Sequence, residues 1–201
     1  MLFLWQVQTQ CDFFFRATEQ INVAMGTLSK AIGGENASAD TIGLFAGIQA
    51  SLTAAANISK ALWGQAGKRS DERKILRDRI GVLDDSPLRP SKMRDHFDHY
   101  DERLQRWWDL GQEPHHYIDM SIVTPGAIKF DPPIQPEDKF RVLEPLSMTM
   151  TFWGDEVPLR EVYAEISRIY PKVIEQSHLA AASARLQAMA IGKPPDAAKA
   201  E

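Results

Sequence analysis

The sequence predicts a mainly α-helical protein, an antiparallel bundle of four long helices with a short extra helix and a small β insertion. Three observations predict it. Long stretches carry apolar residues at alternating spacings of three and four, glycines and prolines stand between these stretches, and one later segment changes to the period of a strand. Apolar residues make up 44% of the 201 residues and charged residues 25%, as in globular proteins. We expect a single domain over residues 1–191 and a flexible tail over 192–201.

The first two helices are predicted over residues 3–32 and about 40–63. The apolar stripe of the first stops before Gly33 and Gly34, which are suited to end a helix. Asp40 is suited to cap the second, whose many small residues allow a neighbouring helix to approach closely. The short loop between them predicts an antiparallel hairpin.

Three further helices are predicted. Ser70 is suited to cap a short charged helix over about 71–84. The third long helix spans about 91–110 and stops at Gly111, and the last runs from about 158 to 191.

The insertion between the third and fourth long helices covers about residues 112–156. Its β-branched and aromatic runs alternate with turn residues, including Gly154. Four strands are expected: residues 117–123, 127–130, 140–143 and 148–153. This insertion is too small for a core of its own, so we expect it to pack on the helices.

Charge and cysteine content exclude several classes of protein. There are 23 Lys and Arg against 27 Asp and Glu, a formal net charge of −4, which disfavours binding of polyanions over the whole surface. A local basic strip remains at residues 68–94, with nine basic and five acidic residues. The single cysteine, Cys11, excludes an intrachain disulfide framework and a zinc site built on cysteines. No apolar run reaches the roughly 18 residues of a membrane span, so we expect a cytoplasmic protein with no membrane contact.

Motifs for common cofactors are missing from the sequence. There is no GxxxxGK[ST] loop, no GxGxxG after a strand and no GxSxG elbow. Glu175 and His178 form one Glu-x-x-His element of a di-iron bundle, but no second copy accompanies it. We therefore expect no cofactor and no metal.

The third long helix carries the densest cluster of chemistry-bearing residues, between Arg94 and Arg103. One interpretation is a solvated helix with charge pairs such as Arg94 with Asp98. The other follows from helix geometry: at roughly 100° per residue, His99 lies about 160° from Phe97 and points away from the core stripe. An imidazole can take the proton of a ribose 2′-hydroxyl while a guanidinium holds the phosphate, so this pair can cleave RNA without a metal.

Arg94, the polar Asp95 that follows it, and His99, which is separated from Arg94 by four residues, resemble the R-polar-x(n)-H motif of the HEPN superfamily. The resemblance implies a helical bundle, a homodimer with both motifs in one cleft, and metal-independent endoribonuclease activity in a toxin or defence system. By this resemblance Arg94 binds the scissile phosphate and His99 is the general acid or base. Accessory roles fall to Asp95, His96 and Tyr100, and RNA-binding roles to Arg89 and Lys92. An antitoxin or another protein partner is also implied.

Two other functions remain open. Some HEPN proteins have lost activity, so the second hypothesis is a non-catalytic bundle that binds RNA, a nucleotide or a protein partner. The third is a structural or regulatory bundle with no nucleic-acid role. The environment of His99 separates the first two: a cleft facing the partner's arginine favours the enzyme, and local ion pairs on an open surface favour the binding module.

Overall fold

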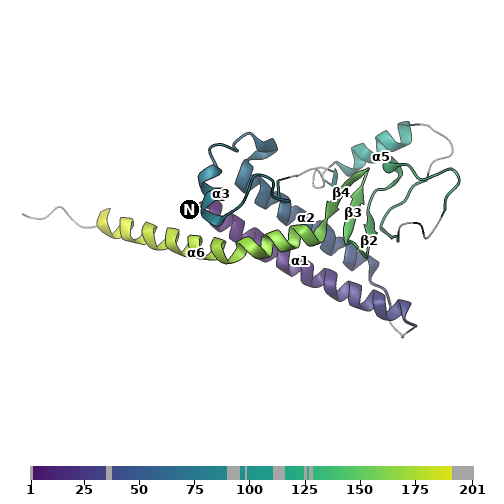
Figure 1. The fold of residues 1–201 in the computed structure, drawn as a ribbon, viewed down its shortest axis with the longest axis horizontal. Coiled ribbons are helices and arrows are strands. Elements are labelled where there is room, and N and C mark those ends of the chain that lie inside the picture. The colour runs from purple at the N-terminus through teal and green to yellow at the C-terminus, as the bar shows by residue number, and fades with distance from the viewer. Residues whose placement is uncertain are drawn as a thin grey trace, which may run out of the picture.

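The computed structural model is mainly helical, with one small β-sheet at one end of the helices (Figure 1). It describes residues 2–34, 38–89, 96–97, 99–110, 116–124, 126 and 129–191. Three helices are long: α1 (Leu2–Ile32), α2 (Thr41–Trp63) and α6 (Leu159–Ile191). Two are short: α3 (Lys74–Ile80) and α5 (Tyr100–Asp109). The helical class is therefore confirmed, whereas the described residues contain three long helices and not the expected four.

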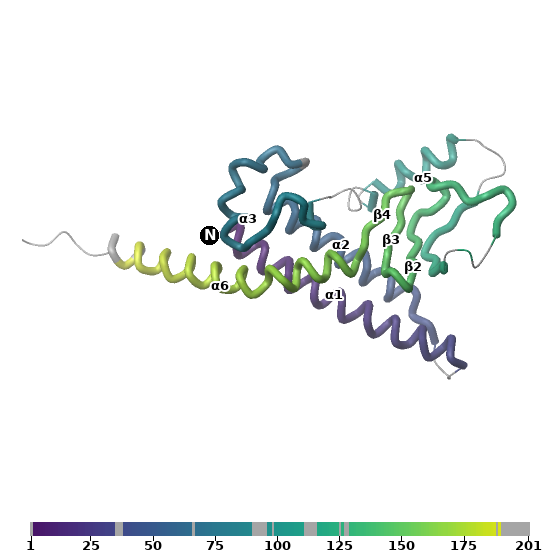
Figure 2. The backbone as a smooth tube through the Cα atoms, in the orientation of Figure 1, coloured from purple at the N-terminus to yellow at the C-terminus, as the bar shows by residue number. Residues whose placement is uncertain are grey.

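Helices α1 and α2 form the predicted antiparallel hairpin, which the tube trace follows from end to end (Figure 2). The end signals act as expected. Helix α1 ends at Ile32 and Gly34 takes a φ of 80°, a conformation that glycine adopts without strain. The Asp40 carboxylate accepts a hydrogen bond from the backbone N–H of Gly43 at 2.7 Å, which caps α2.

The first half of α1 and the second half of α2 pack on α6 and form what we call the helical region. Its core is mostly aliphatic because α1 and α6 each turn one apolar stripe inward and α2 is buried on several faces. Helix α6 continues through Pro171. The core side chains on the three helices include Val7, Cys11, Phe14, Ile58, Leu62, Ile166, Ile169 and Val173.

A four-stranded sheet forms at the other end of the hairpin, in the order β1-β2-β3-β4. The strands are β1 (Ser121–Ile122), β2 (Val142–Glu144), β3 (Thr149–Phe152) and β4 (Asp155–Pro158). Strand β1 pairs in parallel with β2, whereas the other two pairings are antiparallel. The expected partner strand at 127–130 is wrong for residues 129 and 130, which are not in a strand, and residues 127–128 lie outside the described residues.

The turn between β3 and β4 comes one residue earlier than the sequence predicts. Trp153 and Gly154 have φ values of 50° and 78°, so both central residues of this two-residue turn are left-handed. A turn with this geometry matches the twist of two antiparallel strands. Because the turn ends at Gly154, residues 155 and 156 belong to β4. The bulky Trp153 is unusual in this conformation.

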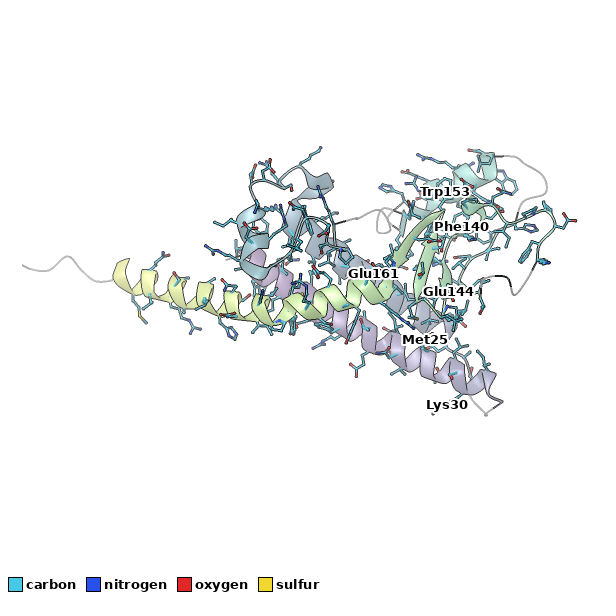
Figure 3. All side chains as sticks on the ribbon, in the orientation of Figure 1. Met25, Lys30, Phe140, Glu144, Trp153 and Glu161 are labelled. Carbon is cyan, nitrogen blue, oxygen red and sulfur yellow. The ribbon has the colours of Figure 1, made fainter. Side chains whose placement is uncertain are left out.

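The sheet packs on the second half of α1 and the first half of α2, and with α5 it makes up what we call the sheet region. Its core joins Ile21, Leu44 and Ile48 of the hairpin to residues of the sheet. Phe140 and Phe152 are fully buried at its centre, and Figure 3 labels Phe140 among the side chains there. The insertion therefore packs on the helices, as expected, and shares their core.

Helix α5 is the remnant of the predicted third long helix. The sequence predicts residues 91–110, but α5 begins at Tyr100, since His99 has a non-helical φ of −119° and ψ of 38°. His96 and Phe97 are helical, and residues 90–95, 98 and 111 lie outside the described residues. Helix α5 lies over the sheet and contains no fully buried residue. Helix α5 is amphipathic, and its Tyr100 and Trp107 are only partly buried against the aromatic core of the sheet region. It is therefore not a helix of the bundle.

Helix α3 is also shorter than expected, starting at Lys74 and not near Ser70. The preceding residues turn because Arg73 reaches back to the last carbonyls of α2, those of Lys60 and, at 2.9 Å, Ala61. Gly81, with a φ of 73°, ends α3 in the left-handed conformation.

One described helix, α2, is long and apolar enough to cross a membrane by length and composition. It is largely buried between α1, α6 and the sheet, as the core helix of a soluble protein is. The fold is compatible with a soluble protein.

Candidate functional site

Residues 94–99, which we call the motif segment, directly precede α5 in the chain. Arg94, Asp95 and Lys92 lie outside the described residues. His96, His99 and Tyr100 are described, and they have three different environments. The geometry of the site is therefore built from these three side chains and their contacts.

His99 is exposed at the N-terminal end of α5. Its Nδ1 lies 3.2 Å from Oε1 of Glu102, and the two side chains are 52% and 54% exposed. Its Nε2 makes no hydrogen bond to any residue that the structure describes. The expected exposure is confirmed, although the reason differs, because His99 precedes the helix and is not part of it.

His96 is buried, with 7% of its surface exposed. Its ring stacks on Phe152, with centroids 5.1 Å apart and planes 3° from parallel. Nε2 lies 2.8 Å from Oδ2 of Asp155, and Nδ1 accepts a hydrogen bond from Nε of Arg103 at 3.1 Å. An Nδ1 that accepts and an Nε2 that donates define the neutral tautomer. His96 therefore ties the motif segment to the β3–β4 turn.

Tyr100 points into a polar network on the sheet. Its hydroxyl lies 2.5 Å from that of Tyr117 and donates to Asp119 at 3.0 Å. Arg141 lies over the Tyr100 ring at 5.0 Å and binds both oxygens of Asp119. Burial, together with the hydrogen bond to Tyr117, raises the pKa of Tyr100 above its ordinary value, so this phenol stays protonated.

Asp119 is the charged centre of this network. Burial raises its pKa, but the hydrogen bond and charge of Arg141 outweigh burial, and the net pKa lies below its ordinary value. The Met120 backbone N–H also donates to its Oδ1, at 2.9 Å. The carboxylate is thus ionised and fully engaged. This suits a structural role in which Asp119, just before β1, is held to Arg141, just before β2.

Sequence reasoning missed several residues that surround the motif: Arg103, Tyr117, Asp119, Arg141 and Asp155. The one available signal was Asp119, a charge inside an otherwise apolar strand segment. Two of its partners, Tyr100 and Arg141, lie 19 and 22 residues away along the chain, so no local pattern reveals them.

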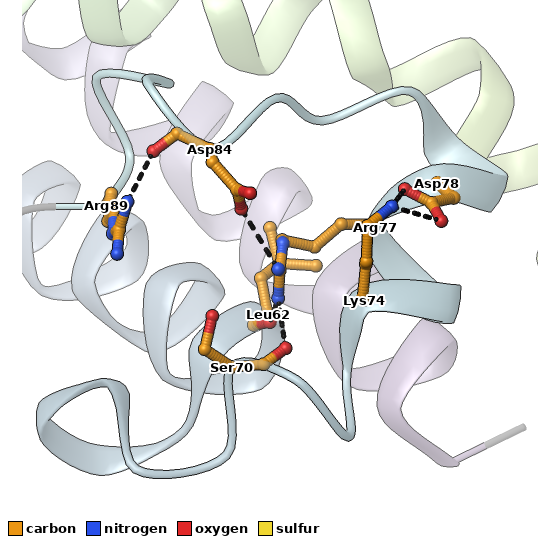
Figure 4. A network of polar contacts seen from close by, with 7 residues as sticks. All are labelled: Leu62, Ser70, Lys74, Arg77, Asp78, Asp84 and Arg89. Atoms are coloured by element: carbon orange, nitrogen blue, oxygen red, sulfur yellow. Dashed lines mark hydrogen bonds and ion pairs between the residues drawn. The ribbon is translucent and has the colours of Figure 1, made fainter.

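Several described cations of the basic strip are engaged within the fold (Figure 4). Arg77 is buried at 3% exposure and donates to the carbonyls of Leu62 and Ser70 and to Asp84. Lys74 pairs with Asp78 at 2.8 Å, and Arg89 donates to the Asp84 carbonyl at 2.9 Å. Much of the strip serves to join α3 to the end of α2.

The described part of the strip also lies apart from His99. Figure 1 shows α3 beside the middle of α6 and α5 above the sheet, well separated in the view. Arg89, predicted to bind RNA, is exposed within the network near α3. Within one chain, the described cations of the strip and His99 do not line a common surface.

Two other candidates from the sequence have ordinary structural surroundings. Burial raises the pKa of the Cys11 thiol to about 12, so this cysteine is a buried apolar side chain and not a nucleophile. Glu175 and His178 are exposed on α6. Among the residues that the structure describes, no three His, Cys, Asp or Glu side chains lie close enough together to hold a metal ion.

Comparison with family models, with curated proteins and with solved structures finds no match for this chain. The similarity to the HEPN superfamily therefore rests on the spacing of Arg94, Asp95 and His99 and on the mainly helical class.

Proposed function

We propose that this protein is a metal-independent endoribonuclease of the HEPN type, acting as a homodimer. One observation carries the proposal: His99 is exposed and its Nε2 has no partner among the described residues. The local pair of its Nδ1 with Glu102 orients the ring in this proposal, although by the criterion of the sequence analysis such a pair on an open surface favours the binding module. A histidine oriented by a carboxylate through one nitrogen leaves the other nitrogen to move a proton.

The reaction follows from this arrangement. With its proton on Nδ1, neutral His99 takes the ribose 2′-hydroxyl proton through Nε2. The 2′-oxygen then attacks the adjacent phosphorus and the bond to the 5′-oxygen breaks. The leaving 5′-oxygen takes a proton from water, so that a 2′,3′-cyclic phosphate and a 5′-hydroxyl result, and the imidazolium of His99 returns its proton to the solvent. Arg94, always cationic, stabilises the charge that builds on the phosphoryl oxygens. Asp95 is proposed to orient Arg94.

The fold supplies a reason for the fixed position of His99. His96, three residues earlier, is locked between Asp155, Arg103 and Phe152. Tyr100, the next residue, is locked by Tyr117 and Asp119. An exposed base between two anchored neighbours is held without being buried, as catalysis on a large substrate requires. His96 and Tyr100 thus act as positioning residues in this proposal.

A second function is favoured by the charges around His99. Asp101 and Glu102 occupy the first turn of α5, and the His99–Glu102 pair lies on an open surface of the single chain. Carboxylates repel a phosphate unless cations neutralise them. A non-catalytic module that binds RNA, a nucleotide or a protein partner through this surface is therefore the alternative.

The test is cleavage of RNA by the purified protein in EDTA. We expect His99→Ala to lower the rate about 10²–10⁴-fold, the usual contribution of a general base. Arg94→Ala should do the same and Glu102→Gln should cause a smaller loss. His178→Ala, which removes an exposed histidine on α6, is the matched control and should cleave normally.

Cleavage that survives both His99→Ala and Arg94→Ala would contradict the proposal. If folded wild-type protein does not cleave RNA but binds it, and Arg94→Ala weakens binding, the binding module is correct. An assignment as a toxin or defence component, with an antitoxin as partner, depends on cleavage being observed first.

A further inference from the structure

A cavity of about 510 Å³ opens where the helical region meets the sheet region, and none of its lining residues belongs to α5. Helices α1 and α6 form its sides, and the turn between β2 and β3 closes one end. Its size lies within the range of small-molecule sites, and such sites occur preferentially at junctions between packed units. No lining residue belongs to the motif segment, so the cavity is independent of the proposed nuclease.

The interior of the cavity is apolar. Phe14, Ile21, Met148 and Leu159 line it, and two of these, Phe14 and Ile21, are otherwise buried core residues of α1. Apolar lining of this kind favours a hydrocarbon or aromatic body over a sugar or a free phosphate.

Two of the three hydroxyls in the wall, those of Thr18 and Ser51, are already committed. Thr18 Oγ1 donates to the Phe14 carbonyl at 2.8 Å, and Ser51 Oγ donates to the Ile48 carbonyl at 2.8 Å. Both bonds lie within their own helices. The third hydroxyl, that of Tyr163, belongs to a side chain that is 45% exposed and has no described hydrogen bond. The rest of the wall presents mainly methyl groups and ring carbons.

The rim is polar and cationic. Arg160, in the first turn of α6, is exposed and makes no ion pair with the described residues, and Asn22 on α1 is exposed with no described hydrogen bond. Glu144 interacts with Arg160 through charge, but its carboxylate already accepts from the backbone N–H of Leu146 at 2.9 Å and of Ser147 at 2.6 Å. Figure 3 labels Glu144 on β2 and Met25, another lining residue, on α1.

We propose that this cavity binds a small amphipathic carboxylate, a medium-chain fatty acid in chemical class. The hydrocarbon body fills the space beside Phe14, Ile21 and Leu159. The carboxylate stays at the rim, where Arg160 offers a charged, bidentate donor and Asn22 an amide. The complementary charge and the depth of the apolar wall select a monoanion with one polar end.

Titration of the full chain with octanoate in a calorimeter tests the proposal, with 1-octanol as the neutral probe of equal chain length. We expect saturable binding at one site for octanoate and weaker binding for 1-octanol. Arg160→Ala should weaken octanoate binding about tenfold, as expected for the loss of a charged hydrogen bond at a solvated rim. Arg185→Ala, which removes an exposed arginine elsewhere on α6, should bind octanoate as the wild type does.

A second variant guards against misfolding of the first. Asn22→Trp enlarges an exposed rim residue, so the fold should survive while the mouth is obstructed and octanoate binding is lost. The absence of saturable binding overturns the proposal. Equal binding of octanoate by Asn22→Trp and the wild type would show that octanoate does not bind in this cavity. Equal affinity for octanoate and 1-octanol would show that the carboxylate is not recognised. Each of these outcomes is independent of whether RNA is cleaved.

Discussion

The helical region and the sheet region bury their side chains by different means. In the helical region, aliphatic stripes on α1, α2 and α6 meet, and few polar groups enter the core. In the sheet region the rings of His96, Tyr100 and Phe140 pack around Phe152. The two polar rings, His96 and Tyr100, also form hydrogen bonds with other side chains. The first kind of core depends on local periodicity, whereas the second depends on contacts between segments far apart along the chain.

The largest effect is expected from removing the ring at the centre of the sheet region. Phe152 is fully buried, and Phe152→Ala should lower the free energy of unfolding by about 3–5 kcal/mol, because a large cavity replaces the ring. Urea unfolding followed by circular dichroism and by tryptophan fluorescence measures this. Trp108→Ala on α5, where the tryptophan is 70% exposed, is the control and should change stability by less than about 0.5 kcal/mol.

The same unfolding experiment tests whether the helical region and the sheet region unfold together as one unit. Helices α1 and α2 contribute to both cores, so we expect a single transition for wild type and variant. Two transitions in Phe152→Ala, with the helical region surviving the first, would show that the sheet region unfolds on its own.

The two regions also differ in how far sequence predicts them. Local signals predicted α1 and α2 because their stripes, the glycines at 33 and 34 and the cap at Asp40 all act within a few residues. The length of α5 was mispredicted because its periodicity continues upstream while His99 leaves the helical conformation. The parallel pairing of β1 with β2 was also missed, since it joins residues about 20 positions apart and follows no turn signal.

The candidate site divides in the same way. The exposure of His99 was predicted from helix geometry relative to Phe97, but His99 is exposed as the residue that precedes α5 and not as part of a helix. The burial of His96 was not predicted, because it depends on Asp155, 59 residues later, and on stacking against Phe152. Polar residues that meet only through tertiary contacts leave no periodic signal in a single sequence.

A smaller effect is expected from the charge at the centre of the sheet network. Asp119→Asn removes the ion pair with Arg141 and should cost about 1.5–3 kcal/mol at pH 7, the usual range for hydrogen bonds to charged groups. The folded-state pKa of Asp119 is lowered, so its contribution is present above the ordinary value of 3.8 and disappears as the pH falls through the lower folded pKa. Unfolding measured at pH 7 and pH 3 should show the difference between wild type and variant shrinking in acid.

The helical region offers a matched carboxylate for this titration. Glu165 also has a lowered pKa, chiefly because Arg168 donates hydrogen bonds to it, but Arg168 is 47% exposed. Glu165→Gln should therefore cost less than Asp119→Asn, about 1 kcal/mol or below, with the same loss in acid. A difference for Asp119→Asn that stays constant from pH 7 to pH 3 would contradict the ionised, paired state assigned to this carboxylate.

The smallest single effect is expected at one of two histidines that lie three residues apart, His96 being buried and His99 exposed. His96→Ala should destabilise the protein by about 1–2 kcal/mol, because it removes the ring stacked on Phe152 and leaves Arg103 and Asp155 without their shared partner. His99→Ala should change the free energy of unfolding by less than about 0.5 kcal/mol, since its side chain is 52% exposed and gives α5 no cap hydrogen bond.

Thermal and urea unfolding of both variants, measured beside the RNA cleavage assay, distinguishes a residue that positions its neighbours from a residue that takes part in the reaction. A residue that acts only in the reaction changes the rate and leaves stability alone, whereas a residue that positions another changes both. If His99→Ala proved as destabilising as His96→Ala, the ion pair with Glu102 would be holding the start of α5, and the loss of cleavage in that variant would carry no argument for a general base. A stable His99→Ala that no longer cleaves, beside a destabilised His96→Ala that cleaves poorly, is the result that the two environments predict.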